Sequence, residues 1–451
     1  MDIGSAHLPG GNVTDVTSVA QCCALCAQTA ACVCWSLNQA KHECYLKDNT
    51  DGRRSEAAHV SGVCAVAPTA AAAVTDAVVA RVPATFSSVC MDWWPPNGGC
   101  RGGWGAAGVL SVDFDNPRLV NLAAALAPGF LRIGGSLDKD INYLVGGMTP
   151  DECGSQAAGG RCLNMTRWAQ LHAFAQCTGL QLIFGLNYPN TDGLWNGTNA
   201  EALLRYSAAH NLSLYAVELG EELTSFQVGT PQFANYLQSY HTLHALVADI
   251  WPQVAQRPRV MGPCPGMAWP ELQTWFPAFL NGTRGALDVA VYHSYNNGAI
   301  GPQTPVLLDQ TLWQAQAMTA FAAPYGLPVM LGEGGPHNGG GIPGTTDRFV
   351  ASLEYLDTLG QLTRLGHFGF NRQTLVGGNY ELLACSTDPD CKFAPYPDYF
   401  AGLLWKRLMG TTILNASVAP PANTSLHVTN EFLRRRRKKK RGRRRRRRRE
   451  E

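Results

Sequence analysis

The sequence predicts an α/β protein in which a (β/α)8 TIM barrel follows a small disulfide-rich domain. Eight short apolar runs alternate with longer amphipathic stretches between Phe86 and Phe370, a pattern typical of parallel βα units. Seven of the 15 cysteines lie in the 43 residues from Cys22 to Cys64, the density of a disulfide-stapled module. Hydrophobic residues make up 45% of the 451 residues and charged residues 16%, so wholesale disorder is excluded.

Residues 1–66 form the predicted disulfide-rich module. A zinc site is the alternative, but paired CxxC motifs and a histidine at ligand spacing are absent, so disulfides are favoured. Further along the chain, Cys153 with Cys162 and Cys385 with Cys391 are close enough in sequence to close small loops. The odd total implies a free thiol, an intermolecular bridge or a missing partner. The candidate disulfide cysteines are Cys22, Cys23, Cys26, Cys32, Cys34, Cys44, Cys64, Cys153, Cys162, Cys385 and Cys391.

Seven Asn-x-Ser/Thr sequons agree with a secretory route, together with the cysteines. The N-terminus has neither a basic n-region nor an apolar h-region, and we interpret it as truncated rather than cytosolic. No run of 18 apolar residues is present that would span a membrane. We expect a secreted, extracellular or lumenal glycoprotein that is membrane-associated without a transmembrane segment. The sequons begin at Asn12, Asn164, Asn196, Asn211, Asn281, Asn415 and Asn423.

The barrel is predicted over residues 84–416, after a linker at residues 67–83 that is rich in Ala, Val, Pro and Thr. An open doubly wound sheet is the alternative, but no Gly-rich dinucleotide loop follows an early apolar run. The eight predicted strands are Phe86–Met91, Phe130–Ile133, Leu180–Leu186, Leu214–Leu219, Arg259–Gly262, Val289–Tyr292, Pro328–Leu331 and His367–Phe370.

The basic residues are concentrated at the end of the chain. Arg434–Arg449 holds 15 of the 36, and without residues 434–451 there remain 21 basic and 32 acidic residues, a net charge of −11. The body is therefore acidic, which argues against a nucleic-acid enzyme with a basic groove. The tail has the composition of a nuclear or polyanion-binding signal, but the disulfides and sequons favour a disordered, solvated extension.

Carboxylates follow two of the predicted strands, where a barrel places its reacting groups. Glu218-Leu-Gly-Glu221-Glu222 comes at the end of the fourth strand, and Gly332-Glu333 comes after the seventh. Most glycoside hydrolases use two carboxyl groups on either side of the scissile bond. Ordinary surface carboxylates are the alternative for each position alone. The pair at two strand ends favours catalysis.

The residues near these carboxylates suit a sugar site. Tyr292-His-Ser-Tyr295 closes the sixth strand, and Arg372-Gln373 and Asn379-Tyr380 follow the eighth. Aromatic rings offer flat faces to sugars, and polar side chains contact hydroxyl groups. The run Gly339-Gly340-Gly341 is suited to present backbone N–H groups to an anion such as a uronate. The alternatives are core packing for His293 and Tyr295 and a flexible loop for the glycines.

Ala84–Leu414 resembles the catalytic barrel of the heparanase-like glycoside hydrolases, family 79, and particularly the plant heparanase-like proteins. Residues 1–66 resemble a PAN/apple module, which is expected to bind a glycan or matrix ligand; a stabilising appendage without a ligand is the alternative. The module's matching stretches are Cys22–Cys26, Cys32–Trp35 and Glu43–Leu46. The barrel's matching stretches are Met91–Pro96, Leu131–Ser136, Phe184–Asn187, Glu218–Leu223, Leu331–Gly335, Arg372-Gln373, Gly377–Tyr380, Pro397–Tyr399 and Leu404–Gly410.

The resemblance implies a retaining mechanism without a metal or cofactor, with Glu222 as acid/base and Glu333 as nucleophile. It implies two carboxyl groups about 5–5.5 Å apart and a covalent glycosyl-enzyme. Tyr380, Gly339 and Gly340 would hold a uronate, Asp92 would contact sugar hydroxyls and Tyr295 would lie near the nucleophile. The substrate-binding candidates are Asp92, Glu221, His293, Tyr295, Gly339, Gly340, Gln373 and Tyr380.

Two features depart from the family pattern. The family has Asn directly before the acid/base, where this chain has Glu221. A second carboxyl group there is expected to raise the proton affinity of the pair, and we expect Glu221→Asn to raise kcat/KM on a glucuronide. The family also continues into a C-terminal β-sandwich, whereas residues 417–451 hold only a short segment and the basic tail. We therefore expect the sandwich to be mostly missing and apolar surface to be exposed on the barrel's flank.

The sequence as a whole predicts a secreted, retaining β-glucuronidase for glucuronic-acid-bearing glycans or glycoconjugates. The acidic body disfavours densely sulfated heparan chains, since like charges repel. A non-catalytic carbohydrate- or matrix-binding protein on a hydrolase scaffold is the alternative.

Overall fold

The computed structural model describes residues 2–3, 7–29, 32–48, 53–54, 59–62, 71–93, 107–149, 151, 162–223, 225–266, 269–296, 305–388 and 390–419. They fall into two compact units: one comprises the described residues up to Ala73 together with Ser417–Ala419, and the other runs from Val74 to Ala416. The predicted cysteines Cys64 and Cys153 and the basic tail lie outside the described residues.

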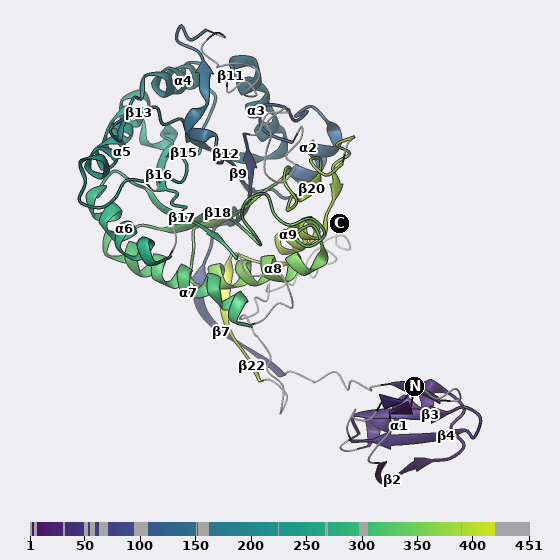
Figure 1. The fold of residues 1–451 in the computed structure, drawn as a ribbon. Helices are drawn as coiled ribbons and strands as arrows, with labels where there is room; N and C mark the ends of the chain where they lie inside the picture. Colours follow the sequence, from purple (N-terminus) through teal and green to yellow (C-terminus); the bar gives the residue numbers. More distant parts are fainter. Residues whose placement is uncertain are drawn as a thin grey trace, which may run out of the picture. The chain divides into compact units, whose positions relative to one another are not determined.

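The larger unit is a closed barrel of eight parallel strands, which confirms the predicted fold. Its helices form a ring around the strands (Figure 1). The strands are β8 (Ser87–Asp92), β9 (Gly129–Gly134), β12 (Leu180–Leu186), β15 (Ala216–Leu219), β16 (Arg259–Pro263), β17 (Val289–Tyr295), β18 (Val329–Gly335) and β19 (Gly369–Arg372). The helices are α2 (Pro117–Ala124), α3 (Met165–Thr178), α4 (Thr198–Ala209), α5 (Pro231–Ile250), α6 (Trp269–Gly282), α7 (Pro305–Ala322), α8 (Phe349–Arg364) and α9 (Pro397–Leu408).

Side chains fill the barrel from inside and outside. An inner cluster includes Phe130, Ile183, Met261 and Met330, so the interior is packed rather than open. A larger cluster lies between the strands and the surrounding helices. Polar side chains fix where helices begin: Asn164, for example, caps α3 by accepting a hydrogen bond from the Arg167 N–H at 2.8 Å.

Two strands continue three and four residues past their predicted ends. β17 continues past Tyr292 to Tyr295, and β18 continues past Leu331 to Gly335. The ladder between them shifts register after Tyr292, so that His293 pairs with Glu333. An irregularity of this kind re-aims side chains at a barrel rim. Glu333 is therefore part of a strand and does not lie on the loop that follows.

The smaller unit contains a four-stranded sheet in the order β2 (His7–Val13), β4 (Glu43–Lys47), β3 (Cys34–Asn38), β6 (His59–Gly62) and one helix, α1 (Val19–Gln28). The disulfide Cys22–Cys44 joins α1 to β4. A second disulfide, Cys26–Cys32, closes the end of the helix. Cys23 is also disulfide-bonded. A short ladder pairs β1 (Asp2–Ile3) with β5 (Arg53–Arg54).

The predicted linker is wrong for most of its length. β7 (Ala71–Arg81) pairs with β22 (Thr412–Ala419). The Arg81 guanidinium donates to the Thr412 hydroxyl at 3.0 Å, and the Thr75 hydroxyl donates to the Asn415 carbonyl at 3.4 Å. The alanines in this stretch indicated a linker, but its Val and Thr residues suit a strand once a partner strand is available.

The expected apolar flank is present on α8 and α9, which pack against each other. Three side chains of each helix, spaced three or four residues apart, point outward among the described residues. They are Phe349, Leu353 and Leu356 on α8, and Phe400, Leu404 and Leu408 on α9. No described helix is both long enough and apolar enough to cross a membrane.

Candidate active site

Arg132 lies at the centre of a carboxylate cluster at the carboxyl end of the barrel. Its guanidinium is fully buried, and its three nitrogens donate to Glu218 at 2.7 Å, Glu221 at 2.6 Å and Glu333 at 2.8 Å. Burial lowers the Arg132 pKa, but Glu218 and Glu221 outweigh it and hold the pKa well above its ordinary value. A Cβ at Gly134 would lie 2.7 Å from the Arg132 Cζ. This glycine therefore makes room for the guanidinium.

β15 and the turn after it supply three of the carboxyl groups. Glu218 and Glu221 are buried, whereas the Glu222 side chain is 37% exposed. The turn passes through positive φ at Gly220 (+70°) and Glu222 (+49°), and the Glu222 N–H donates to the Cys264 carbonyl at 3.1 Å. Glu222 thus has a left-handed backbone conformation that residues other than glycine rarely adopt.

Glu333 is held from both sides on β18. One carboxylate oxygen accepts from Arg132, and the other accepts from the Tyr295 hydroxyl at 2.5 Å. A carboxylate oxygen of Glu333 lies within 4.8 Å of one of Glu222, and the same limit includes a ligand atom of Glu221 and of His293. The fold thus brings together the two carboxyl groups that the sequence singled out, although they are 111 positions apart.

The surroundings shift the pKa values of Glu333 and Glu221 in opposite directions. Burial acts to raise the pKa of Glu333, but the charges of His293 and Arg132 and hydrogen bonds from Tyr295 and Glu221 hold this pKa below its ordinary value. Burial raises the pKa of Glu221 well above the ordinary value, and Glu333 and Glu222 add to that rise against the attraction of Arg132. Glu333 is thereby suited to be an anion and Glu221 to be a neutral acid.

His293, Asp92 and Gln373 adjoin this centre. His293 Nδ1 lies 3.1 Å from a Glu222 oxygen and 3.5 Å from a Glu221 oxygen. Asp92 accepts from the Trp93 N–H at 2.6 Å and from the Gln373 amide at 3.4 Å. Burial and the nearby Glu333 raise the pKa of Asp92. These predicted residues therefore lie beside the carboxylates.

The predicted anion loop lies next to Tyr380. Gly339 and Gly340 both have positive φ, and the Gly340 carbonyl accepts from the Asn379 N–H at 2.6 Å. A Cβ at Gly341 would lie 2.9 Å from the Tyr380 ring, so a glycine is needed for this close approach. Burial, Glu333 and Asp92 raise the pKa of Tyr380. The loops after β18 and β19 therefore meet near the carboxylates.

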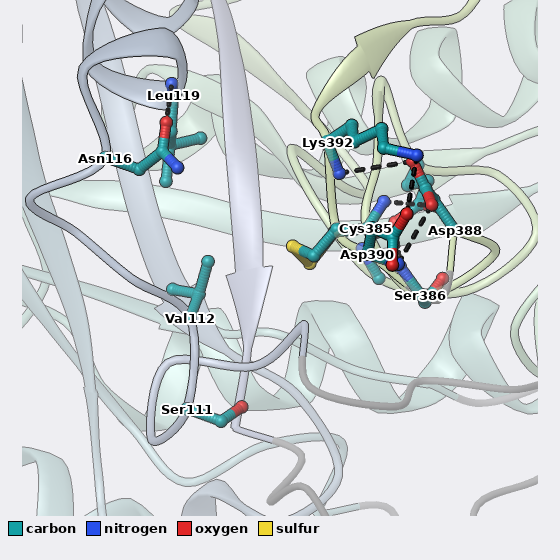
Figure 2. The surroundings of a disulfide bond; sticks show 12 residues. Ser111, Val112, Asn116, Leu119, Cys385, Ser386, Asp388, Asp390 and Lys392 are labelled. Carbon is teal, nitrogen blue, oxygen red and sulfur yellow. Dashed lines mark hydrogen bonds and ion pairs between the residues drawn. A yellow bond between two sulfur atoms is a disulfide. The ribbon is translucent and has the colours of Figure 1, made fainter.

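A disulfide loop supports Tyr380 through its neighbour Glu381. The buried Glu381 carboxylate accepts hydrogen bonds from the backbone N–H groups of Gly377, Cys385, Ser386 and Thr387. Cys385 and Cys391 form the disulfide that their spacing predicts. Figure 2 shows Cys385 and Ser386 near the acidic side chains of Asp388 and Asp390, in a view that also includes Val112 and Leu119. This loop fixes the chain that carries Tyr380.

The four groups within 4.8 Å of one another, Glu221, Glu222, His293 and Glu333, have the chemistry of cation ligands. Two of them already contact the guanidinium of Arg132, which supplies positive charge to the cluster. We therefore interpret the cluster as a site for proton transfer and nucleophilic attack.

Comparisons with known proteins identify the family. Residues 69–360 match the profile of the glycosyl hydrolase family 79 N-terminal domain. The chain belongs to glycosyl hydrolase family 79. This family 79 hydrolase is 32% identical to heparanase-like protein 3 of Arabidopsis thaliana over 75% of its own length and 67% of the relative's. It is 28% identical to the baicalin-beta-D-glucuronidase of Scutellaria baicalensis, over 77% of this chain and 72% of that one.

Solved structures share the fold of this family 79 hydrolase. A 4-O-alpha-L-rhamnosyl-beta-D-glucuronidase from Fusarium oxysporum superposes with a TM-score of 0.52 at 15% identity, over 76% of this chain and 73% of that one. A family 51 alpha-L-arabinofuranosidase from Bifidobacterium longum gives a TM-score of 0.56 at 13% identity, over 81% of each chain. These structures show the shared (β/α)8 barrel fold, while the family match makes the protein a glycoside hydrolase.

The site contains residues that sequence reasoning missed. Arg132 lies within a stretch that matches the family, but the sequence predicts no role for it or for Glu381. Glu218 is predicted only as one of the carboxylates at the end of the fourth strand. A lone arginine inside an apolar strand was the available signal, because a buried charge requires partners. Its partners lie 86, 89 and 201 positions further along the chain, beyond the reach of local patterns.

Proposed function

We propose that the protein is a retaining β-glucuronidase in which Glu333 is the nucleophile and Glu222 the acid/base. The observation that carries the proposal is the approach of Glu222 and Glu333 oxygens to within 4.8 Å. Retaining enzymes hold their carboxyl groups about 5–5.5 Å apart, whereas inverting enzymes leave about 6.5–9.5 Å for a water molecule. The separation here fits direct attack on the sugar.

The environments of the two carboxyl groups match these roles. Glu333 is buried and receives hydrogen bonds from Arg132 and Tyr295, which keep it ionised and fix its direction. It attacks the anomeric carbon as the glycosidic bond breaks. Glu222 reaches solvent, so it can protonate the leaving oxygen and then take a proton from the water that releases the sugar.

A glucuronide is the proposed substrate because backbone N–H groups suited to an anion lie on the loop after β18, the strand that carries Glu333. Among the described residues, the N–H groups of Gly339 and Gly340 donate to no protein acceptor, and Tyr380 lies beside them. Such N–H groups suit a uronate carboxylate. Relatives named as a baicalin-beta-D-glucuronidase and as heparanases support the same substrate class. The acidic body favours weakly charged glycans or small glucuronides over densely sulfated chains.

The test uses 4-nitrophenyl β-D-glucuronide with the wild type, Glu222→Gln and Glu333→Gln. We expect release of nitrophenol by the wild type and a loss of at least about 1000-fold in Glu333→Gln. Proton NMR should show the β-anomer of glucuronic acid as the first product. Initial α-anomer would refute retention, and equal inertness of all three proteins would favour the non-catalytic binding protein.

A secretory route is the proposed location. Disulfides occur in both units, and oxidising compartments favour them. Five sequon asparagines of the barrel unit are exposed: Asn164, Asn196, Asn211, Asn281 and Asn415. Expression in a eukaryotic secretory system and treatment with an N-glycosidase should increase electrophoretic mobility. Unchanged mobility would remove the glycoprotein assignment. A glycan or matrix ligand of the apple-like module stays a prediction.

A further inference from the structure

The charges around Arg132 do not balance if every carboxyl group is ionised. Three carboxyl groups contact this one guanidinium at 2.6–2.8 Å, and their side chains are 0–8% exposed. Three buried anions around one cation would leave two uncompensated negative charges in a region with little water. Uncompensated buried charges are costly, and carboxyl groups avoid the cost by binding a proton. At least one of Glu218, Glu221 and Glu333 therefore carries one.

The donors around each group indicate where that proton lies. Both oxygens of Glu333 accept hydrogen bonds, one from Arg132 and one from Tyr295. In Glu218, Oε2 accepts from Arg132, while Oε1 has no hydrogen-bond partner among the described residues, so a proton there would lack an acceptor. Glu221 Oε1 lies 3.5 Å from His293 Nδ1, which is nearer to Glu222. A side-chain hydrogen bond joins Glu221 to Glu333, and oxygens of the two groups lie within 4.8 Å of each other.

We propose that Glu221 is a third working carboxyl group of the site, which rests as a neutral acid and donates its proton in a hydrogen bond to Glu333. The inference rests on the proposed nucleophilic role of Glu333. Glu221 is then a positioning residue, because its O–H keeps the nucleophile ionised and fixes its direction. Since Glu221 is neutral, the positive charge of Arg132 is balanced by Glu218 and Glu333. No bond of Glu221 breaks during the reaction.

The groups that face Glu221 from every packed element agree with this assignment. Burial, Glu333, Glu222 and Asp138 raise its pKa, and Arg132 alone among the principal charges lowers it. The remaining titratable neighbours are the thiols of Cys90 and Cys264 and the phenol of Tyr236, whose pKa values burial raises, so they are neutral at neutral pH. His293 lies 3.5 Å away and is the remaining group able to carry positive charge.

The proposal predicts that the alkaline limb of the kcat/KM profile depends on the loss of two protons. When Glu221 loses its proton, the nucleophile loses a donor and gains a neighbouring negative charge. Activity then falls with the loss of two protons, one from the acid/base and one from Glu221. A glutamine at this position keeps the length and an N–H donor but cannot ionise.

The test compares pH profiles of kcat/KM for wild type, Glu221→Gln, Glu221→Asn and the surface control Glu271→Gln on 4-nitrophenyl β-D-glucuronide. We expect the alkaline limb of Glu221→Gln to lose one proton where wild type and control lose two. Glu221→Asn should also lose one, which keeps the test valid if glutamine disturbs folding. Identical alkaline limbs in all four proteins, or a loss beyond 100-fold in a folded Glu221→Gln, would overturn the proposal.

An infrared measurement separates this inference from the glucuronidase assignment. The wild-type minus Glu221→Gln difference spectrum near neutral pH should contain the C=O band of a protonated carboxylic acid, which disappears in alkaline solution. A carboxylate band in its place would overturn the inference even in an active enzyme. If the protonated band is present but the protein cleaves no glucuronide, the inference about the protonation of Glu221 stands and the proposed glucuronidase function is rejected.

Discussion

A Cβ atom placed on Gly266 would lie 2.3 Å from the Cδ of Glu222, closer than side chains approach in folded proteins. The glycine after β16 therefore provides the space that the Glu222 side chain occupies at the barrel mouth. Its contact links the fifth strand's loop to the group proposed as acid/base.

Replacing Gly266 with Ala should displace Glu222 and lower kcat by about 10- to 100-fold, since a shift near 1 Å in a reacting group has effects of that order. The change adds one methyl group, so Tm should change little. Glu271→Gln is the control, because Glu271 is exposed on α6. Steady-state kinetics and calorimetry check both variants, and a fully active Gly266→Ala would contradict the assignment of Glu222.

Arg132→Met should destabilise the barrel and abolish activity. It leaves buried carboxyl groups without their cation, which costs about 3–5 kcal/mol when one partner of a buried pair is removed. Arg205, which pairs with Glu201 and Asp249 at the surface, is the control, and Arg205→Met should leave activity unchanged. Urea unfolding and nitrophenol release measure the two effects. Equal stability of the two variants would show that Arg132 is dispensable.

Tyr295→Phe should move the acid limb of the kcat/KM profile to higher pH. The Tyr295 hydroxyl helps to hold the Glu333 pKa below its ordinary value, so its removal raises that pKa. Glu333 must be ionised to attack, and activity is therefore lost at a higher pH as the solution is acidified. At a pH below both pKa values, activity should fall about tenfold for every pH unit by which the limb moves. Profiles of the two proteins that coincide on the acid side would falsify the role of this hydroxyl.

Replacing Cys385 and Cys391 together with Ser should raise KM for a glucuronide more than it lowers kcat. The disulfide constrains the loop that Glu381 anchors, and Glu381 directly follows Tyr380 of the proposed uronate site. Closing a loop this short contributes about 2 kcal/mol of stability in the chain-entropy account. Exposed Cys177 provides the control, and Cys177→Ser should change neither KM nor Tm. A lower kcat at unchanged KM would place the loop's effect elsewhere.

Phe349→Asp with Leu404→Asn should reduce self-association of the protein without lowering Tm. These side chains are 68% and 56% exposed among the described residues, so little burial is lost. Exposed apolar surface of this kind promotes association. Light scattering over a concentration series measures the change. A fall in Tm as large as that of a core substitution would mean that the two side chains are buried in solution.

The eight barrel strands could be predicted because buried parallel strands form apolar runs that turns separate. Glu222 and Glu333 could be selected as candidates because both follow such runs, and the family resemblance gave them their proposed roles. The lengths of β17 and β18 could not be predicted, because His293 and Glu333 interrupt the apolar pattern while the strand pairing continues through them. The partners of Arg132 are set by closure of the barrel, which no local pattern contains.

The pairing of β7 with β22 joins the segment that enters the barrel to the segment that leaves it. Arg81 and Thr412 are 331 positions apart in the chain, and the Arg81 guanidinium donates to the Thr412 hydroxyl at 3.0 Å. This β7–β22 pair holds the two ends of the barrel segment together. A circular permutant that joins the ends of β7 and β22 and opens a loop on the amino-terminal side of the barrel strands should retain the catalytic cluster. The chain therefore enters and leaves the barrel through two paired strands that lie side by side.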